Sequence, residues 1–173
     1  MEGLLSSNLI SQNALSGEPV YNSNLYLYNV GDENTSLTGG WVKTETDWSL
    51  NVGTITKNAA NIALYAAATK AATCGVANTI DFTNYSKINL LCDITTTNAN
   101  GSSAYIWIRT NKTGYQAGSL LAGVEFVINA TSLTDKLITL DISSINQSAY
   151  AMVRNFSYTR ATTVSVKQVW LEV

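Results

Sequence analysis

Much of the chain alternates between apolar and polar residues with a period of two, which is typical of strands that bury one face. Residues 86–94 show the pattern most clearly, because Ile88, Leu90, Cys92 and Ile94 fall on one side. Further strands are predicted at 25–30, 120–129, 136–140, 148–155 and 163–172, and residues 39–57 predict one or two more. In the last strand the apolar register shifts by one residue, which predicts a β-bulge near Lys167–Gln168.

Two segments allow more than one local structure. Residues 59–77 are rich in alanine, which favours a helix. Ile62 and Leu64 alternate there, however, and no good cap precedes them, so two strands and a turn are predicted. The pair Asn100-Gly101 lies between two strand-like runs. Because both residue types accept positive φ, the pair predicts a β-hairpin.

About nine or ten short strands with almost no helix predict an all-β fold, an antiparallel β-sandwich. We expect one domain over residues 25–173, since a chain of 173 residues can bury about 70% of its unfolded surface. Residues 1–24 are poor in β-branched residues and contain the only proline, Pro19. They predict an N-terminal arm or anchor, either extended or with one short helix.

Charge is sparse and excludes some partners. Only 13% of residues are charged and the net charge is -2, while 21 Thr, 17 Ser and 18 Asn supply the polar surface. Phosphate binding needs a concentrated positive field, so no nucleic acid is expected. No run reaches the roughly 18 apolar residues that span a bilayer, and the first residues lack the features of a signal peptide. We therefore expect no membrane association and synthesis in the cytoplasm.

The chain contains no histidine, which excludes Ser-His-Asp and Cys-His catalysis, histidine-bound metals and proton transfer by imidazole. Two facing carboxylates, as in glycosidases, are the remaining enzymatic option. We expect a protein that is not an enzyme. Cys74 and Cys92 follow no CxxC pattern and predict two small buried hydrophobic residues. A disulfide between them requires neighbouring strands.

Residues 105–110 and 148–155 predict a candidate surface. If Ile106 and Ile108 point inward, the residues between them share the opposite face, and residues 148–155 follow the same logic. The candidate ligand or partner surface comprises Tyr105, Trp107, Arg109, Tyr150 and Arg154. Rings stack on sugars and arginine donates planar hydrogen bonds, but this composition is also typical of protein interfaces. A reversed sheet, with these aromatic residues in the core, stays an alternative because one sequence does not fix the buried face.

A structural calcium ion is a second candidate. Asp32, Glu33 and Glu172 would supply ligands if the first and last strands pair. Solvated surface acids are the simpler interpretation of the same residues. No other cofactor is expected.

Four strings resemble a known family when they are taken together in order. They are LYLYNVGDENTSLTGGW (25–41), IDFTNYSK (80–87), ITLDISSINQSAYAMVR (138–154) and VKQVWLE (166–172). They resemble β-sandwich domains of tail and other virion proteins from bacteriophages of Firmicutes. The resemblance implies a jelly roll like those of carbohydrate-binding modules and galactose-binding domains. It supplies no catalytic residues.

The resemblance implies a structural or accessory protein of the virion, made in the host cytoplasm. Because the chain is short, a capsid decoration protein or a small tail or neck component is the main expectation. It would attach to other virion proteins through its N-terminal arm, as a homo-oligomer or in a lattice. The alternative is a glycan-binding module for adhesion to the host surface.

Overall fold

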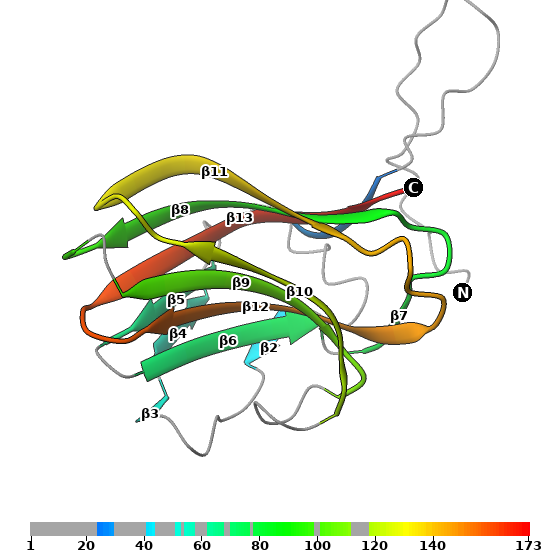
Figure 1. Ribbon diagram of the computed structural model, residues 1–173, viewed down its shortest axis with the longest axis horizontal. Coiled ribbons are helices and arrows are strands. Elements are labelled where there is room, and N and C mark those ends of the chain that lie inside the picture. Colours follow the sequence, from blue (N-terminus) through cyan, green and yellow to red (C-terminus); the bar gives the residue numbers. More distant parts are fainter. Residues whose placement is uncertain are drawn as a thin grey trace, which may run out of the picture.

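The computed structural model contains thirteen strands and no helix in the residues that it describes (Figure 1). The strands form two sheets, so the predicted all-β sandwich is confirmed. The predicted N-terminal arm, residues 1–24, lies outside the described residues apart from Asn24. The described residues are 24–29, 41–43, 51–52, 54–57, 62–67, 70–76, 78–98, 101–111 and 118–173. Within these ranges, no helix is long and apolar enough to cross a membrane.

The first sheet has six strands in the order β11, β8, β13, β5 and β4, with β1 also beside β13. On one side β13 pairs with β8 over its whole length, and on the other it pairs with β5 and then with β1. The earliest and latest described strands are therefore neighbours (Figure 1). The bounds are β1 Leu25–Asn29, β4 Thr54–Lys57, β5 Ile62–Ala66, β8 Lys87–Thr96, β11 Ser132–Asp141 and β13 Thr162–Glu172.

The second sheet has seven strands in the order β10, β9, β12, β6 and β2, with β3 beside β6 and β7 beside β12. All its pairs are antiparallel except β3 with β6. The bounds are β2 Trp41–Lys43, β3 Asn51–Val52, β6 Lys70–Val76, β7 Ile80–Asp81, β9 Ser102–Arg109, β10 Leu120–Val127 and β12 Ser148–Ser157.

The core lies between the sheets and follows the predicted alternation. Ile88, Leu90, Cys92 and Ile94 are all fully buried, as the pattern in β8 predicts. The bulge predicted in the last strand is confirmed by a register shift between Val166 and Gln168. Because of this shift, the apolar residues on both sides of the bulge reach the core. The buried residues of β13 are Thr162, Val164, Val166, Val169 and Leu171.

The hairpin predicted at Asn100-Gly101 is wrong, because β8 and β9 belong to different sheets. Gly101 does adopt the expected positive φ, +85°. A Cβ atom there would lie 2.9 Å from Thr159 Oγ1, so the Thr159 side chain would have to shift to accommodate a larger residue. Turn chemistry specifies the local backbone angles but not the sheet that the next strand joins. Here the connection crosses from one layer of the sandwich to the other.

The alanine-rich segment forms two strands, β5 and β6, as predicted. Small side chains suit this region because the packing is close: Ala66 and Ala72 are fully buried. At Gly75 a Cβ atom would lie 2.6 Å from the carbonyl oxygen of Ala151 in the neighbouring strand. Tertiary packing therefore overrides the helix propensity of alanine.

Asn155 is a polar residue at a core position, and it connects the two sheets. It is fully buried on β12 of the second sheet. Its Nδ2 donates to the carbonyl oxygen of Leu64 at 2.7 Å and to that of Thr162 at 2.8 Å, both in the first sheet. A buried amide with two good acceptors stabilises the fold, whereas its loss leaves buried acceptors without those donors.

We predict that Asn155→Ala lowers the free energy of unfolding by about 1–3 kcal/mol, because two buried carbonyl groups lose their donor. Urea denaturation measures the change. Asn146→Ala is the matched control, since Asn146 is exposed and its loss should change the value by less than about 0.5 kcal/mol. Equal effects of the two variants would contradict the role of Asn155.

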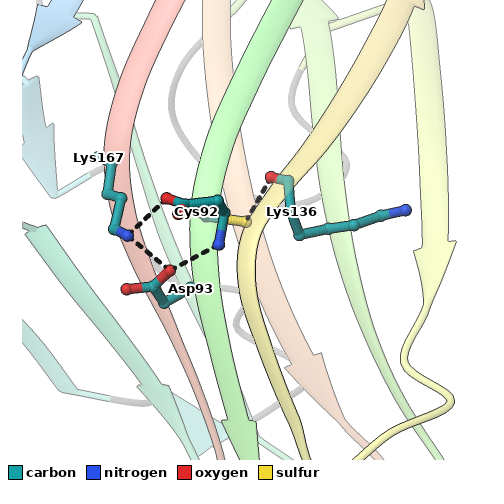
Figure 2. Close-up of polar contacts among 5 residues, drawn as sticks. Cys92, Asp93, Lys136 and Lys167 are labelled. Atoms are coloured by element: carbon teal, nitrogen blue, oxygen red, sulfur yellow. Dashed lines mark hydrogen bonds and ion pairs between the residues drawn. The ribbon is translucent and has the colours of Figure 1, made fainter.

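Neither cysteine forms a disulfide; both are buried in the core and lie in different sheets, so their interpretation as small core residues is confirmed. The Cys92 thiol lies against β11, where its Sγ is 3.7 Å from the carbonyl oxygen of Lys136 (Figure 2). Burial, with a smaller contribution from the Asp93 carboxylate, raises the pKa of the Cys92 thiol from 9.0 to about 12. The thiol is therefore protonated near neutral pH.

We predict that a thiol reagent modifies neither cysteine of the native protein and both in denaturant, because only unfolding exposes them. The raised pKa has a further consequence for pH. The folded state retains the Cys92 proton more strongly, so this contribution to stability is complete below pH 9.0 and is lost as the pH rises toward about 12. The unfolding free energy should therefore fall less over this range in Cys92→Ala. Rapid native modification would contradict the burial.

Candidate functional site

Strand alternation and pairing place the five predicted surface residues on one face of the second sheet. Ile106 and Ile108 belong to the core, so the residues between them in β9 face outward. Tyr150 lies opposite Arg109, and Arg154 lies opposite Tyr105. The sheet is therefore not reversed, but Trp107 is buried, as that alternative supposed for the aromatic residues. We call this surface the aromatic–arginine face; it comprises Tyr105, Trp107, Arg109, Tyr150, Arg154 and also Phe156, which follows Arg154 at the same spacing.

The guanidinium group of Arg154 lies among three aromatic rings. Its Cζ is 4.8 Å from the ring centroid of Trp107, 5.1 Å from that of Phe156 and 6.0 Å from that of Tyr105. A cation within about 6 Å of a ring face is attracted by the ring quadrupole, and more strongly where water is excluded. Arg154 therefore fixes the positions of the rings around it.

Arg109 contacts the same indole from another position. Its Cζ is 5.4 Å from the Trp107 ring centroid, and its Nη2 donates to the carbonyl oxygen of Gly118 at 3.1 Å. Gly123 in β10 lies opposite Trp107, and a Cβ atom there would be 2.9 Å from Trp107 Cδ1. The absence of a side chain at Gly123 lets the indole lie close to the neighbouring strand.

Burial divides the aromatic–arginine face into a packed centre and an accessible edge. Trp107 is only 9% exposed, Arg109 6% and Arg154 4%. Tyr105 and Tyr150 are half-buried. Beyond Phe156, Tyr158 is 57% exposed. Tyr158 packs edge-on against Phe156, with 4.3 Å between the ring centroids and an interplanar angle of 89°.

A carboxylate completes the accessible edge. Glu125 in β10 lies opposite Tyr105 and is exposed. Its Oε1 accepts hydrogen bonds from Ser103 Oγ at 2.7 Å and from Tyr105 Oη at 2.8 Å. Burial, and then the bond to Glu125, raise the pKa of the Tyr105 phenol to about 12. The phenol therefore remains a hydrogen-bond donor at neutral pH.

Three residues of this surface were not predicted from the sequence: Glu125, Phe156 and Tyr158. Phe156 could have been found, since it continues the outward spacing of β12. Glu125 reaches the site through the register of β10 on β9, which shifts between Leu120 and Ala122 and has no local signal.

The predicted calcium site is only partly described. Asp32 and Glu33 lie outside the described residues, so the site stays a prediction. The first and last described strands do pair, as the hypothesis requires. Glu172, however, accepts hydrogen bonds at Oε1 from Asn89 Nδ2 at 2.9 Å and from Trp170 Nε1 at 3.1 Å. Among the described residues, no three His, Cys, Asp or Glu side chains are grouped as metal ligands.

A charged cluster on the outer face of the first sheet has a structural explanation. Lys167 Nζ lies 2.8 Å from Asp93 Oδ1 (Figure 2). It also lies 2.7 Å from Asp135 Oδ1. The backbone N–H of Asp135 also donates to Asp93 Oδ1, at 2.9 Å. Burial raises the pKa of Asp93, but hydrogen bonds from Lys167 and Asp135 outweigh it, so the pKa is lowered overall.

The same cluster joins two bulges. Lys167 lies at the register shift of β13, and Asp135, with φ +52°, lies at the shift between Leu133 and Lys136 in β11. The three charged groups therefore fix the irregular backbone of two strands on either side of β8.

No protein-family model matches the sequence, and no curated protein matches it. Solved structures share the fold at low identity. A carbohydrate-binding module specific for non-crystalline cellulose, CBM28, has a TM-score of 0.54 at 11% identity, over 78% of this chain and 87% of the module. A legume lectin-like domain from Entamoeba histolytica has a TM-score of 0.50 at 8% identity, over 82% of this chain and 93% of that domain.

A bacteriophage structure is also similar. The enzymatically active domain of tailspike protein 4 from bacteriophage CBA120 has a TM-score of 0.50 at 14% identity. The match covers 86% of this chain but only 22% of the tailspike chain. At these identities the similarity establishes the β-sandwich fold, which the carbohydrate-binding module shares.

We predict that Glu125→Gln lowers the pKa of Tyr105 from about 12, because the neutral amide no longer stabilises the protonated phenol against ionisation. The 13Cζ shift of labelled tyrosine, followed through the alkaline range, reports the change. Tyr105→Phe assigns the signal, and Tyr65, exposed on the first sheet, serves as the internal control. An unchanged Tyr105 titration in Glu125→Gln would contradict the hydrogen bond.

Proposed function

We propose that this chain is a non-catalytic carbohydrate-binding module that holds a glycan at the accessible edge of the aromatic–arginine face. The observation that carries the proposal is the combination of rings and a carboxylate there. Tyr158 presents an exposed ring beside Phe156, and Glu125 presents an exposed carboxylate beside Tyr105. These are the groups that recognise the apolar faces and the hydroxyl groups of a sugar.

The packed centre supports the accessible edge. Arg154 and Trp107 hold the inner side of Tyr105 and Phe156, so few side chains need to be ordered when a ligand binds. Preorganisation of this kind improves affinity because the side chains of the site have already lost conformational entropy in the free protein. The arginines therefore act as positioning residues for the rings.

The fold supports the same function. The CBM28 structure is described as specific for non-crystalline cellulose, and another similar structure is described as legume lectin-like. Proteins with this fold have many different functions, so the proposal rests on the residues of the site. The fold is consistent with the proposal. Non-crystalline cellulose and soluble glucan oligosaccharides are the first probes.

A role in a phage particle is the second candidate. It is supported by the resemblance of residues 25–41, 80–87, 138–154 and 166–172 to virion β-sandwich domains, and by the shared fold of the tailspike domain. On a particle, the same glycan site would serve adhesion to a host surface. Attachment to other virion proteins would then involve a different part of the chain, such as residues 1–24.

We predict that Tyr158→Ala and Tyr105→Ala each weaken glycan binding by about tenfold, which corresponds to about 1.4 kcal/mol, because each removes a stacking ring. Isothermal titration with cellohexaose and laminarihexaose, and pull-down on regenerated amorphous cellulose, measure the change. Glu125→Gln should weaken binding less and leave the fold intact.

Tyr65→Ala is the matched control, because Tyr65 is 41% exposed but lies in β5 of the other sheet. If none of a broad panel of glycans binds the wild-type protein, the proposal is wrong. Binding of the purified chain to phage particles that lack it, without any glycan signal, would favour the structural role in the virion.

A further inference from the structure

The outer face of the first sheet carries a second aromatic and polar row that the proposed site does not use. Tyr26 in β1 lies opposite Trp170 in β13, and Trp170 lies opposite Asn89 in β8. Asn89 in turn lies opposite Thr139 in β11. Four neighbouring strands thus contribute one residue each to a line across the sheet.

Two rings form one end of this row. The centroids of Tyr26 and Trp170 are 6.1 Å apart, with an interplanar angle of 33°. Both side chains are half-buried, so each retains an accessible part. They are not needed to attach β1 to the core, because Leu27 and Tyr28 do so. The register shift between Tyr26 and Tyr28 turns both of these residues inward, where they are 0% and 7% exposed.

The polar residues of the row are held in one arrangement. Thr139 Oγ1 donates to Asn89 Oδ1 at 2.6 Å, and Asn89 Nδ2 donates to Glu172 Oε1 at 2.9 Å. Trp170 Nε1 donates to the same oxygen at 3.1 Å. Both donors meet at Oε1, and no described residue donates to Glu172 Oε2. This chain of hydrogen bonds orients the carboxylate beside the indole and leaves one acceptor oxygen for a ligand.

Charged groups continue the surface in the next row. Glu172 lies opposite Lys87, which lies opposite Asp141, and both of these are exposed. Stacking rings bordered by alternating donors and acceptors suit a sugar, which presents apolar C–H faces and a rim of hydroxyl groups. A purely apolar protein partner would leave these charges buried and unpaired.

We infer that Tyr26, Trp170 and Glu172 form a second saccharide-binding site on the outer face of the first sheet. This inference rests on the proposed function and extends it. The two sites lie on the outward faces of two sheets that pack against each other, so one ligand segment cannot occupy both. The module would therefore bind two glycan chains at once and cross-link them.

The second site can be measured alone in a protein whose first site is removed. In the background Tyr105→Ala with Tyr158→Ala, titration with cellohexaose should still show one site per chain, compared with two in the wild type. Adding Trp170→Ala should abolish this remaining binding, while Trp170→Phe should retain part of it because a ring is still present. Adding Tyr65→Ala, on the same sheet but remote from the row, should have no effect.

Thermal unfolding of each variant shows that it is folded, and Glu172→Gln, which keeps the side-chain shape, should weaken the remaining site severalfold. The wild type should also aggregate a soluble β-glucan in a turbidity assay, whereas loss of either site should prevent this. The inference would be overturned if the wild type bound one glycan per chain, if the Tyr105 and Tyr158 changes abolished this binding, and if Trp170→Ala had no effect on it. The proposed function would then still stand. Absence of binding to every glycan tested would contradict both the second site and the proposed function.

Discussion

The register between β9 and β12 is the constraint on which the candidate site depends. Ile106 and Ile108 of β9, and Ala151 and Val153 of β12, must all reach the core, and pairing aligns them. Every residue between them is then forced onto the outer face. A slip of one residue in either strand would turn the arginine of that strand, Arg109 or Arg154, into the apolar interior, which is strongly unfavourable. Hydrophobic burial thus determines where the rings and guanidinium groups meet.

The fold was largely predictable because the burial of one strand face leaves a period-two signal. The phase change at Lys167–Gln168 even located a bulge. The connection at Asn100-Gly101 was not predictable, because positive φ at Gly101 is compatible with a hairpin and with a crossing between sheets. The choice depends on which strands pair, and pairing depends on residues far apart in the chain.

Part of the candidate site could be predicted from the sequence, as could much of the fold. Tyr105, Trp107 and Arg109 could be grouped because they lie on one strand, and pairing of β9 with β12 added Tyr150 and Arg154. Their exposure could not be predicted, since packing around Trp107 depends on the glycine at position 123 of another strand. Glu125 and the row through Trp170 and Asn89 depend on register alone, which one strand's sequence does not specify.

The bulge at Asp135 has a consequence for the behaviour of the molecule in solution. β11 forms one edge of the first sheet, and a regular edge strand offers free backbone groups to any strand that approaches. The left-handed residue at Asp135 interrupts that regular line, and Asp135 and Lys136 add charges beside it. An approaching strand would lose hydrogen bonds and desolvate charges. This side of the sandwich is therefore a poor template for amyloid-like growth, even at the high local concentrations found on a crowded surface.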